Sequence, residues 1–180
     1  MRITEGSTTV RSFIIWVCEG TWRASVDAAL NLAPSDARIT LLHVTEPTAP
    51  DAAHGAYLGL LGRRQPRRDP GERVAELAEA AAGELLSAAA SRLGRPCDTV
   101  ERHGPAEREV VTAAAGADLL IVARDGDQTR LGPKSLGKAT RFVVDHAPCP
   151  VLLVWPRTAP GIGTIPPPPG KEEPHSAPHS

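Results

Sequence analysis

The chain is organised around the segment Ala117–Trp155, ADLLIVARDGDQTRLGPKSLGKATRFVVDHAPCPVLLVW. It opens with the continuous apolar run Leu119–Ala123, which is typical of a strand buried on both faces. A glycine-bearing loop follows, and apolar residues at helical spacing begin near Gly137. A Pro-Cys-Pro break then leads into a last apolar run, Val151–Val154. This pattern predicts a βαβ unit whose loop lies beyond the carboxyl end of a strand, where doubly wound sheets bind ligands.

Towards the N-terminus the chain continues this alternation of apolar strands and amphipathic helices. The predicted elements are strand 12–18, helix 22–33, strand 39–44, helix 71–93, strand 97–100 and helix 105–115. With the C-terminal unit this makes five strands and four helices. Such alternation predicts an α/β fold with a mostly parallel sheet and right-handed crossovers.

Three segments fall outside this pattern, so we expect one folded domain over residues 11–156. Residues 1–10 are polar and predict a flexible leader. Residues 45–71 hold four prolines, four glycines and four arginines, which predicts a long surface loop. Its arginines either bind a phosphate or an acidic partner or form a solvated basic face, and the second interpretation is favoured. Residues 157–180 include a Pro-Pro-Pro-Pro run and predict a disordered tail.

Composition narrows the class of protein. A formal net charge of −1 argues against binding of nucleic acid through the charge of the whole chain. No apolar run approaches the ~18–20 residues that span a bilayer. The three cysteines have no metal-ligand or CxxC spacing, and no signal peptide is visible. We therefore expect a cytoplasmic protein with reduced thiols and without a nucleic-acid, membrane or metal partner.

The loop after the run Leu119–Ala123 has the chemistry of a phosphate site. Glycines let backbone N–H donors approach an anion closely, and a helix N-terminus adds positive potential. The glycines, cations and hydroxyls concerned are Gly126, Gly132, Gly137, Arg124, Arg130, Lys134, Lys138, Ser135 and Thr140. A solvated loop with ordinary turn glycines accounts for the same residues equally well, so the loop alone leaves both interpretations open.

Two kinds of catalytic motif can be weighed. Gly132–Lys138 fits the first seven positions of a P-loop, but Ala139 stands where a magnesium-binding hydroxyl belongs, and Pro133 lacks an N–H donor. No nucleophile elbow, HExxH or zinc spacing occurs. The polar residues nearest to predicted strand or helix ends are Glu19, Asp125, Asp145 and His146. We therefore expect no catalytic residues and no dedicated enzyme.

Several segments resemble the universal stress protein family, with its UspA-like domain. They are Gly104-Pro105-Ala106, Ala117-Asp118-Leu119-Leu120-Ile121-Val122, His146-Ala147-Pro148-Cys149-Pro150-Val151-Leu152-Leu153-Val154, Glu19-Gly20-Thr21 and Leu41-Leu42-His43-Val44. The resemblance covers residues 12–156. It implies a single-domain, five-stranded parallel sheet of order 3-2-1-4-5 with helices on both faces, of the adenine-nucleotide alpha hydrolase type, commonly dimeric through the last strand.

Many members of that family bind ATP with a loop of the form G-x2-G-x9-G-(S/T), and this chain carries a degenerate version. Gly126 and Gly137 match the second and third glycines. Ala123 replaces the first glycine, and Lys138 replaces the final hydroxyl residue. Ten residues, 127–136, stand where the family has nine. The acidic residue that ends the first strand is Glu19 here and Asp in the family.

Carried over to this chain, the resemblance implies that adenine lies near Val44 and the end of the first strand, with ribose and phosphates along the loop. The implied nucleotide-binding residues are Glu19, Thr21, Val44, Ala123, Arg124, Gly126, Gly137 and Lys138. ATP is the implied cofactor, with Mg²⁺ accompanying it.

The first hypothesis is therefore a dimeric, ATP-binding regulator of the stress response. The second is the same fold without nucleotide, acting as a protein-interaction module. The third is a weak ATPase, which ranks last because no residue is predicted to hold a general base on a water molecule. The apolar edge strand Val151–Val154 separately predicts a homodimer, because an exposed edge of this kind favours a partner.

Overall fold

The computed structural model describes residues 11–46 and 70–165. Their helices and strands are β1 (Ser12–Trp16), α1 (Trp22–Leu32), β2 (Arg38–Thr45), α3 (Pro70–Leu93), β3 (Asp98–His103), α4 (Ala106–Ala113), β4 (Leu119–Ala123), η2 (Pro133–Ser135), α5 (Lys138–His146), β5 (Val151–Val154) and η3 (Ile162–Thr164). The predicted leader, residues 47–69 of the predicted loop and residues 166–180 of the predicted tail lie outside the described residues.

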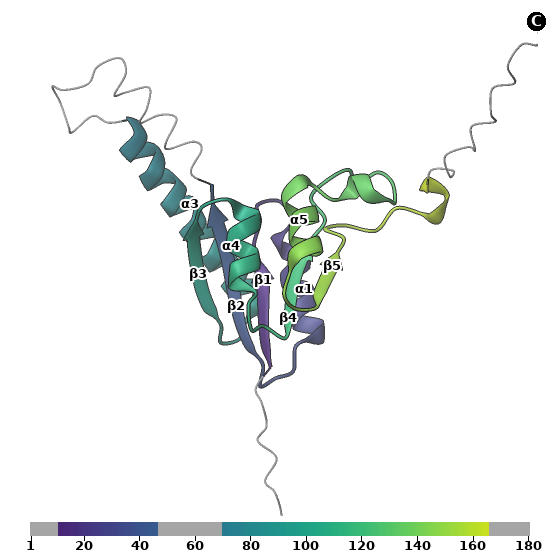
Figure 1. The fold of residues 1–180 in the computed structure, drawn as a ribbon. Helices are drawn as coiled ribbons and strands as arrows, with labels where there is room; N and C mark the ends of the chain where they lie inside the picture. The colour runs from purple at the N-terminus through teal and green to yellow at the C-terminus, as the bar shows by residue number, and fades with distance from the viewer. Residues whose placement is uncertain (1–10, 47–69, 166–180) are drawn as a thin grey trace, which may run out of the picture.

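The five strands form one parallel sheet of order β3-β2-β1-β4-β5, as predicted. The chain runs outward from β1 to β3 and then crosses to β4 on the other side of β1. Helices α1 and α3 cover one face of the sheet, and α4 and α5 cover the other (Figure 1). A doubly wound sheet of this kind opens a crevice at the carboxyl ends of its strands, where the strand order reverses.

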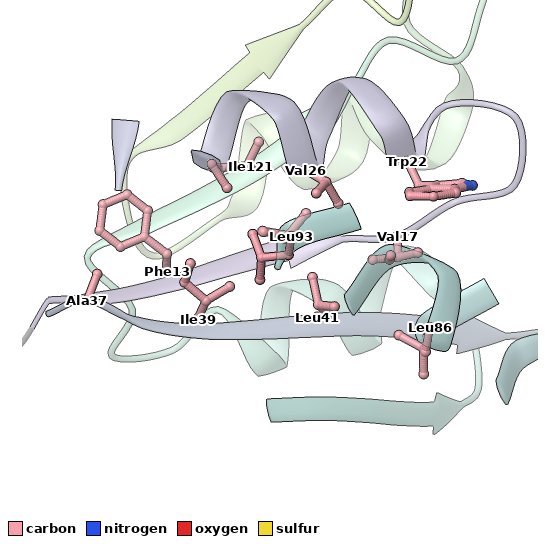
Figure 2. Packing of buried hydrophobic residues seen from close by; sticks show 13 residues of the cluster. Phe13, Val17, Trp22, Val26, Ala37, Ile39, Leu41, Leu86, Leu93 and Ile121 are labelled. Carbon is pink, nitrogen blue, oxygen red and sulfur yellow. The ribbon is translucent and has the colours of Figure 1, made fainter. Parts of the chain in front are cut away.

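Strand β1 supplies side chains to two separate cores. Phe13 and Ile15 pack with α1 and α3, and Ile14 and Trp16 pack with α4 and α5. Figure 2 shows the first of these cores, in which Val26 and the strand residues point towards one another between the helices and the sheet. Because both faces of the strand are covered, its sequence is a continuous apolar run rather than an alternating one.

The edge strand β3 is longer than its sequence predicts. The prediction ended it at Val100, but the strand continues to His103 because Val44 and Thr45 of β2 pair with Arg102 and His103. Polar residues are tolerated here because β3 lies at the edge of the described sheet. Pairing with a neighbouring strand, and not local hydrophobicity, decides where this strand ends.

Helix α3 buries one face in the second half of its 24 residues. Its buried face carries Ala82, Leu86, Ala89 and Leu93, while Leu77 is 68% exposed. The alanines keep the helix close to the sheet and to α1, which it contacts. Among the described helices, none has the length and the apolar character that crossing a membrane requires.

Residues 157–165 belong to the predicted tail, yet they adopt defined structure. The Thr164 hydroxyl donates to the Gly161 carbonyl oxygen at 2.7 Å. The Leu131 N–H donates to Thr164 Oγ1 at 3.0 Å, which joins η3 to the loop after β4. The boundary drawn from composition therefore comes too early, because composition does not reveal a hydrogen bond to a distant loop.

We predict that Leu41→Ala lowers the free energy of unfolding by about 2–5 kcal/mol, because the side chain is fully buried and its removal leaves a cavity. Leu77→Ala is the matched control, since this leucine is exposed, and we expect a change within about 0.5 kcal/mol. Urea denaturation followed by circular dichroism measures both. Equal losses in the two variants would contradict the assignment of the core.

Candidate functional site

The predicted nucleotide-binding residues gather at one edge of the sheet, where parallel strands β1, β2 and β4 end. The turn after β1 carries Glu19 and Thr21, the end of β2 carries Val44, and the loop from Arg124 to Gly137 follows β4. They fall into two groups. Glu19 and Val44 line a cavity, whereas the loop residues are outside its lining.

The cavity has a volume of about 790 Å³ and lies between the ends of β1 and β2 and the helix α3. This volume is within the range of roughly 300–1,000 Å³ that small-molecule sites occupy. Its apolar wall consists of Trp22, Val44, Leu85 and the α3 alanines Ala78, Ala81, Ala82 and Ala88. Among the described residues, the charged or titratable side chains of its lining are Glu19, Glu46, Glu84, Arg23 and His43. The site therefore offers an apolar surface together with an excess of carboxylates.

His43 and Arg23 are cavity residues that the sequence reasoning missed. His43 Nδ1 lies 2.8 Å from the Val17 carbonyl oxygen, so Nδ1 donates, and in the neutral form of the ring Nε2 carries a lone pair. The Arg23 guanidinium stands 4.7 Å from the centre of the Trp22 ring, which engages its charge in a cation–π contact. A histidine at the end of an otherwise apolar strand was the one signal in the sequence.

Thr21 is placed differently from the expectation that it contacts nucleotide. It is the N-cap residue of α1, but its side chain makes no capping hydrogen bond. Its hydroxyl donates to the Cys18 carbonyl oxygen at 3.4 Å, a contact within the turn. Gly20, with φ of +77°, shapes this turn. Thr21 thus serves the turn and is outside the cavity lining.

The loop after β4 is folded back on itself. The Gly126 N–H donates to the Ser135 carbonyl oxygen at 3.0 Å, and the Asp127 N–H donates to the Lys134 carbonyl oxygen at 2.9 Å. A Cβ at position 126 would overlap the Lys134 carbonyl group. Glycine 126 is therefore required by the loop's own packing. The segment Gly132–Lys138 contains a 3-10 turn, η2, and lacks the strand-to-helix geometry of a P-loop.

Two of the four cations in the predicted phosphate cradle are engaged within the protein. The Arg124 guanidinium lies 4.6 Å from the centre of the Trp155 ring and also donates to the Ser135 hydroxyl. Arg130 Nε is 2.8 Å from Asp127 Oδ2. Lys134 and Lys138 are exposed. Arg124 thus joins the ends of β4 and β5 to the loop, which accounts for its position without a ligand.

The start of helix α5 is contacted by the carboxylate of Asp125. The Gly137 N–H donates to Asp125 Oδ1 at 2.7 Å. A Cβ at position 137 would lie 2.5 Å from Asp125 Oδ2, so the carboxylate sits directly against this glycine. An acceptor at a helix N-terminus stabilises the helix by about 0.5–2 kcal/mol. Sequence reasoning named Asp125 only as a polar residue near a strand end and missed this contact.

The cavity beside α3 and the loop after β4 differ in what they offer to the parts of a nucleotide. The cavity with Glu19 and Val44 has the size and the apolar surface for a base and a sugar. At Gly137 a carboxylate already accepts the N–H that a phosphate would need. Ala123, where the family motif has its first glycine, is buried within β4. The loop therefore offers a free backbone donor less readily at Gly137, whereas the cavity has room for a base and a sugar.

Two groups near the carboxyl edge have shifted pKa values, and Asp125 contributes to one of these shifts. Burial raises the pKa of the Cys18 thiol to about 12, and the negative charge of Asp125 adds to the effect. Hydrogen bonds from the Thr129 hydroxyl and N–H, and then from Arg130, lower the pKa of Asp127 to about 2. Near neutral pH the Cys18 thiol is therefore protonated and the Asp127 carboxylate is ionised.

The fold and the site define a doubly wound α/β protein with a small-molecule cavity at the carboxyl edge of its sheet. The model of the "Universal stress protein family" matches residues 21–154, and the chain belongs to this family.

Solved structures share the fold at low sequence identity. The hypothetical protein MJ0577 is 18% identical with a TM-score of 0.61, over 83% of this chain and 98% of that one. The universal stress protein UspA from Lactobacillus plantarum is 21% identical with a TM-score of 0.53, over 80% and 97%. A universal stress protein in complex with cAMP is 17% identical with a TM-score of 0.54, over 83% and 100%. No curated protein matches the chain.

We predict that the protein loses stability as the pH rises above 9. The folded-state pKa of Cys18 is raised above its ordinary value of 9.0, so the folded state holds the thiol proton more tightly than the unfolded state. Thermal melts between pH 8 and 10.5 measure the loss.

Cys18→Ala should make the loss of stability with pH less steep. The pKa of the Cys149 thiol is raised less strongly, so Cys149→Ala should have a smaller effect on this slope. A decline of the same slope in the parent protein and in Cys18→Ala would contradict the assignment to Cys18.

Proposed function

We propose that this universal stress protein is a non-enzymatic regulator that binds an adenine nucleotide, ATP included, at the carboxyl edge of its sheet. The observation that carries the proposal is the cavity in which Glu19 and Val44 meet. These are the residues that the family resemblance assigns to the neighbourhood of adenine and the first strand. The cAMP complex of a related universal stress protein supports a nucleotide as the class of ligand.

The chemistry of the cavity suits the uncharged end of such a ligand. Adenine is planar and largely apolar, and it would pack against Val44 and the alanines of α3. The Glu19 carboxylate is exposed at the rim and is an acceptor for ribose hydroxyls. The lone pair on His43 Nε2 is a further acceptor, suited to an exocyclic amino group. Magnesium, in this proposal, arrives with the phosphates of ATP.

A second candidate function is a nucleotide-independent interaction module. The observation that favours it is the self-sufficient loop, in which Asp125 accepts the Gly137 N–H and Arg124 is engaged by Ser135 and Trp155. A loop in which the Gly126, Asp127 and Gly137 N–H donors already have acceptors gains little from a phosphate at these groups. This candidate retains the fold and the dimer and assigns no ligand to the cavity.

We further propose that the protein is a homodimer through β5. This strand is the last one in the described sheet and pairs with β4 along one side. Val151, Leu152, Leu153 and Val154 are each partly exposed. An apolar edge strand of this kind favours pairing with another edge, and a second copy of the chain provides an identical one.

Filling the cavity should abolish nucleotide binding. Ala81→Trp places an indole on the exposed wall of α3 that lines the cavity, without replacing a core residue. Ala80→Trp is the matched control, because Ala80 is the neighbouring exposed alanine and is outside the lining. Calorimetric titration with ATP and with adenosine should show saturable binding to the parent and to Ala80→Trp but not to Ala81→Trp. Absence of binding to the parent would favour the interaction module.

Sedimentation equilibrium tests the dimer. At micromolar concentration we expect a species of twice the 19.0 kDa mass of the chain, because pairing of two β5 edges removes apolar surface from water. A dilution series then gives the dissociation constant. A single species of 19.0 kDa across the micromolar range would refute the dimer.

A further inference from the structure

The contact between Asp125 and Gly137 bears on which adenine ligand the site accepts. Helix α5 begins at Lys138, and Gly137 directly before it presents its N–H towards the loop. Asp125 Oδ1 accepts this N–H at 2.7 Å, and Oδ2 lies against the Cα of the glycine, where a Cβ would be only 2.5 Å away. The carboxylate thus stands where an anionic ligand would have to sit in order to use this donor.

A phosphate at this position meets two costs. It must displace an acceptor that already satisfies the Gly137 N–H, and it must approach the Asp125 carboxylate at short range. Two nearby cations already have partners within the protein, because Arg124 contacts Ser135 and Trp155 and Arg130 pairs with Asp127, and the Nε of Arg124 is buried without a hydrogen-bond partner. Lys138 is exposed at the first position of the helix.

The cavity has the same electrostatic bias. Among the described residues of its lining are Glu19, Glu46 and Glu84, and the one described arginine there, Arg23, is stacked on Trp22. A ligand with several negative charges is therefore opposed both in the cavity and at the loop. A neutral ligand with an apolar base and hydroxyl donors meets neither cost.

We infer that Asp125 is a specificity-determining residue that makes this site prefer adenine ligands with little or no phosphate charge, such as adenosine, over ATP. The inference rests on the proposed function, because it requires an adenine ligand in the cavity. It goes beyond it by naming the ligand class and the residue that selects it. Asp125 selects by occupying the backbone donor and by its charge.

The test is a calorimetric titration with adenosine, AMP and ATP, without magnesium, on the parent protein and on Asp125→Asn. Asparagine keeps an acceptor for the Gly137 N–H and removes the charge, so the helix start retains its hydrogen bond. We expect the parent to bind adenosine tightest and ATP weakest. In Asp125→Asn, ATP affinity should rise by about tenfold while adenosine affinity stays within about twofold.

Asp145→Asn is the matched control. It removes one exposed carboxylate near the C-terminal end of α5, whereas Gly137 precedes the N-terminal end of that helix. It should leave the ratio of ATP to adenosine affinity unchanged. The inference is overturned if the parent binds ATP more tightly than adenosine, or if Asp125→Asn shifts the ratio no more than Asp145→Asn does. Failure of every ligand to bind the parent would instead refute the proposed function, and the inference with it.

Discussion

The structure depends on the placement of β1 between β2 and β4. Ser12–Trp16 pairs with β2, and Phe13, Ile14 and Ile15 pair with Leu119, Leu120 and Ile121 of β4. These two ladders hold together the halves of the sheet, which the chain builds in opposite directions from β1. Because all the ladders are parallel, every strand ends at the same edge. The turn after β1, the end of β2 and the loop after β4 are thereby brought together.

The common edge has two parts, a cavity beside α3 and a folded loop beside α5. On the side of α3 the walls are alanines, Val44 and Trp22, and they leave a cavity of about 790 Å³. On the side of α5 the loop satisfies its own hydrogen bonds through Ser135 and Asp125. In such a site, the choice between ligands depends on which backbone donors of the loop already have acceptors within the protein.

Much of the fold was predictable because it follows from apolar patterning. The runs at Phe13–Val17 and Leu119–Ala123 are continuous because both faces of the central strands are covered, and the helices between them carry one apolar stripe each. The end of β3 and the ordered residues 157–165 were not predictable. Each depends on a partner distant in the sequence, β2 in one case and Leu131 in the other.

For the site, the amino-acid sequence is enough to predict the kinds of residue at the carboxyl edge: glycines, cations and an acid after each of two strands. It does not predict their partners. The contacts of Arg124 with Trp155, of Gly126 with Lys134 and of Asp125 with the Gly137 N–H arise only when the chain is folded. A charged side chain or an N–H donor looks the same in the sequence whether it binds a ligand or another group of the protein. Its role depends on which group lies within hydrogen-bonding distance, and the folding of the loop after β4 sets that distance.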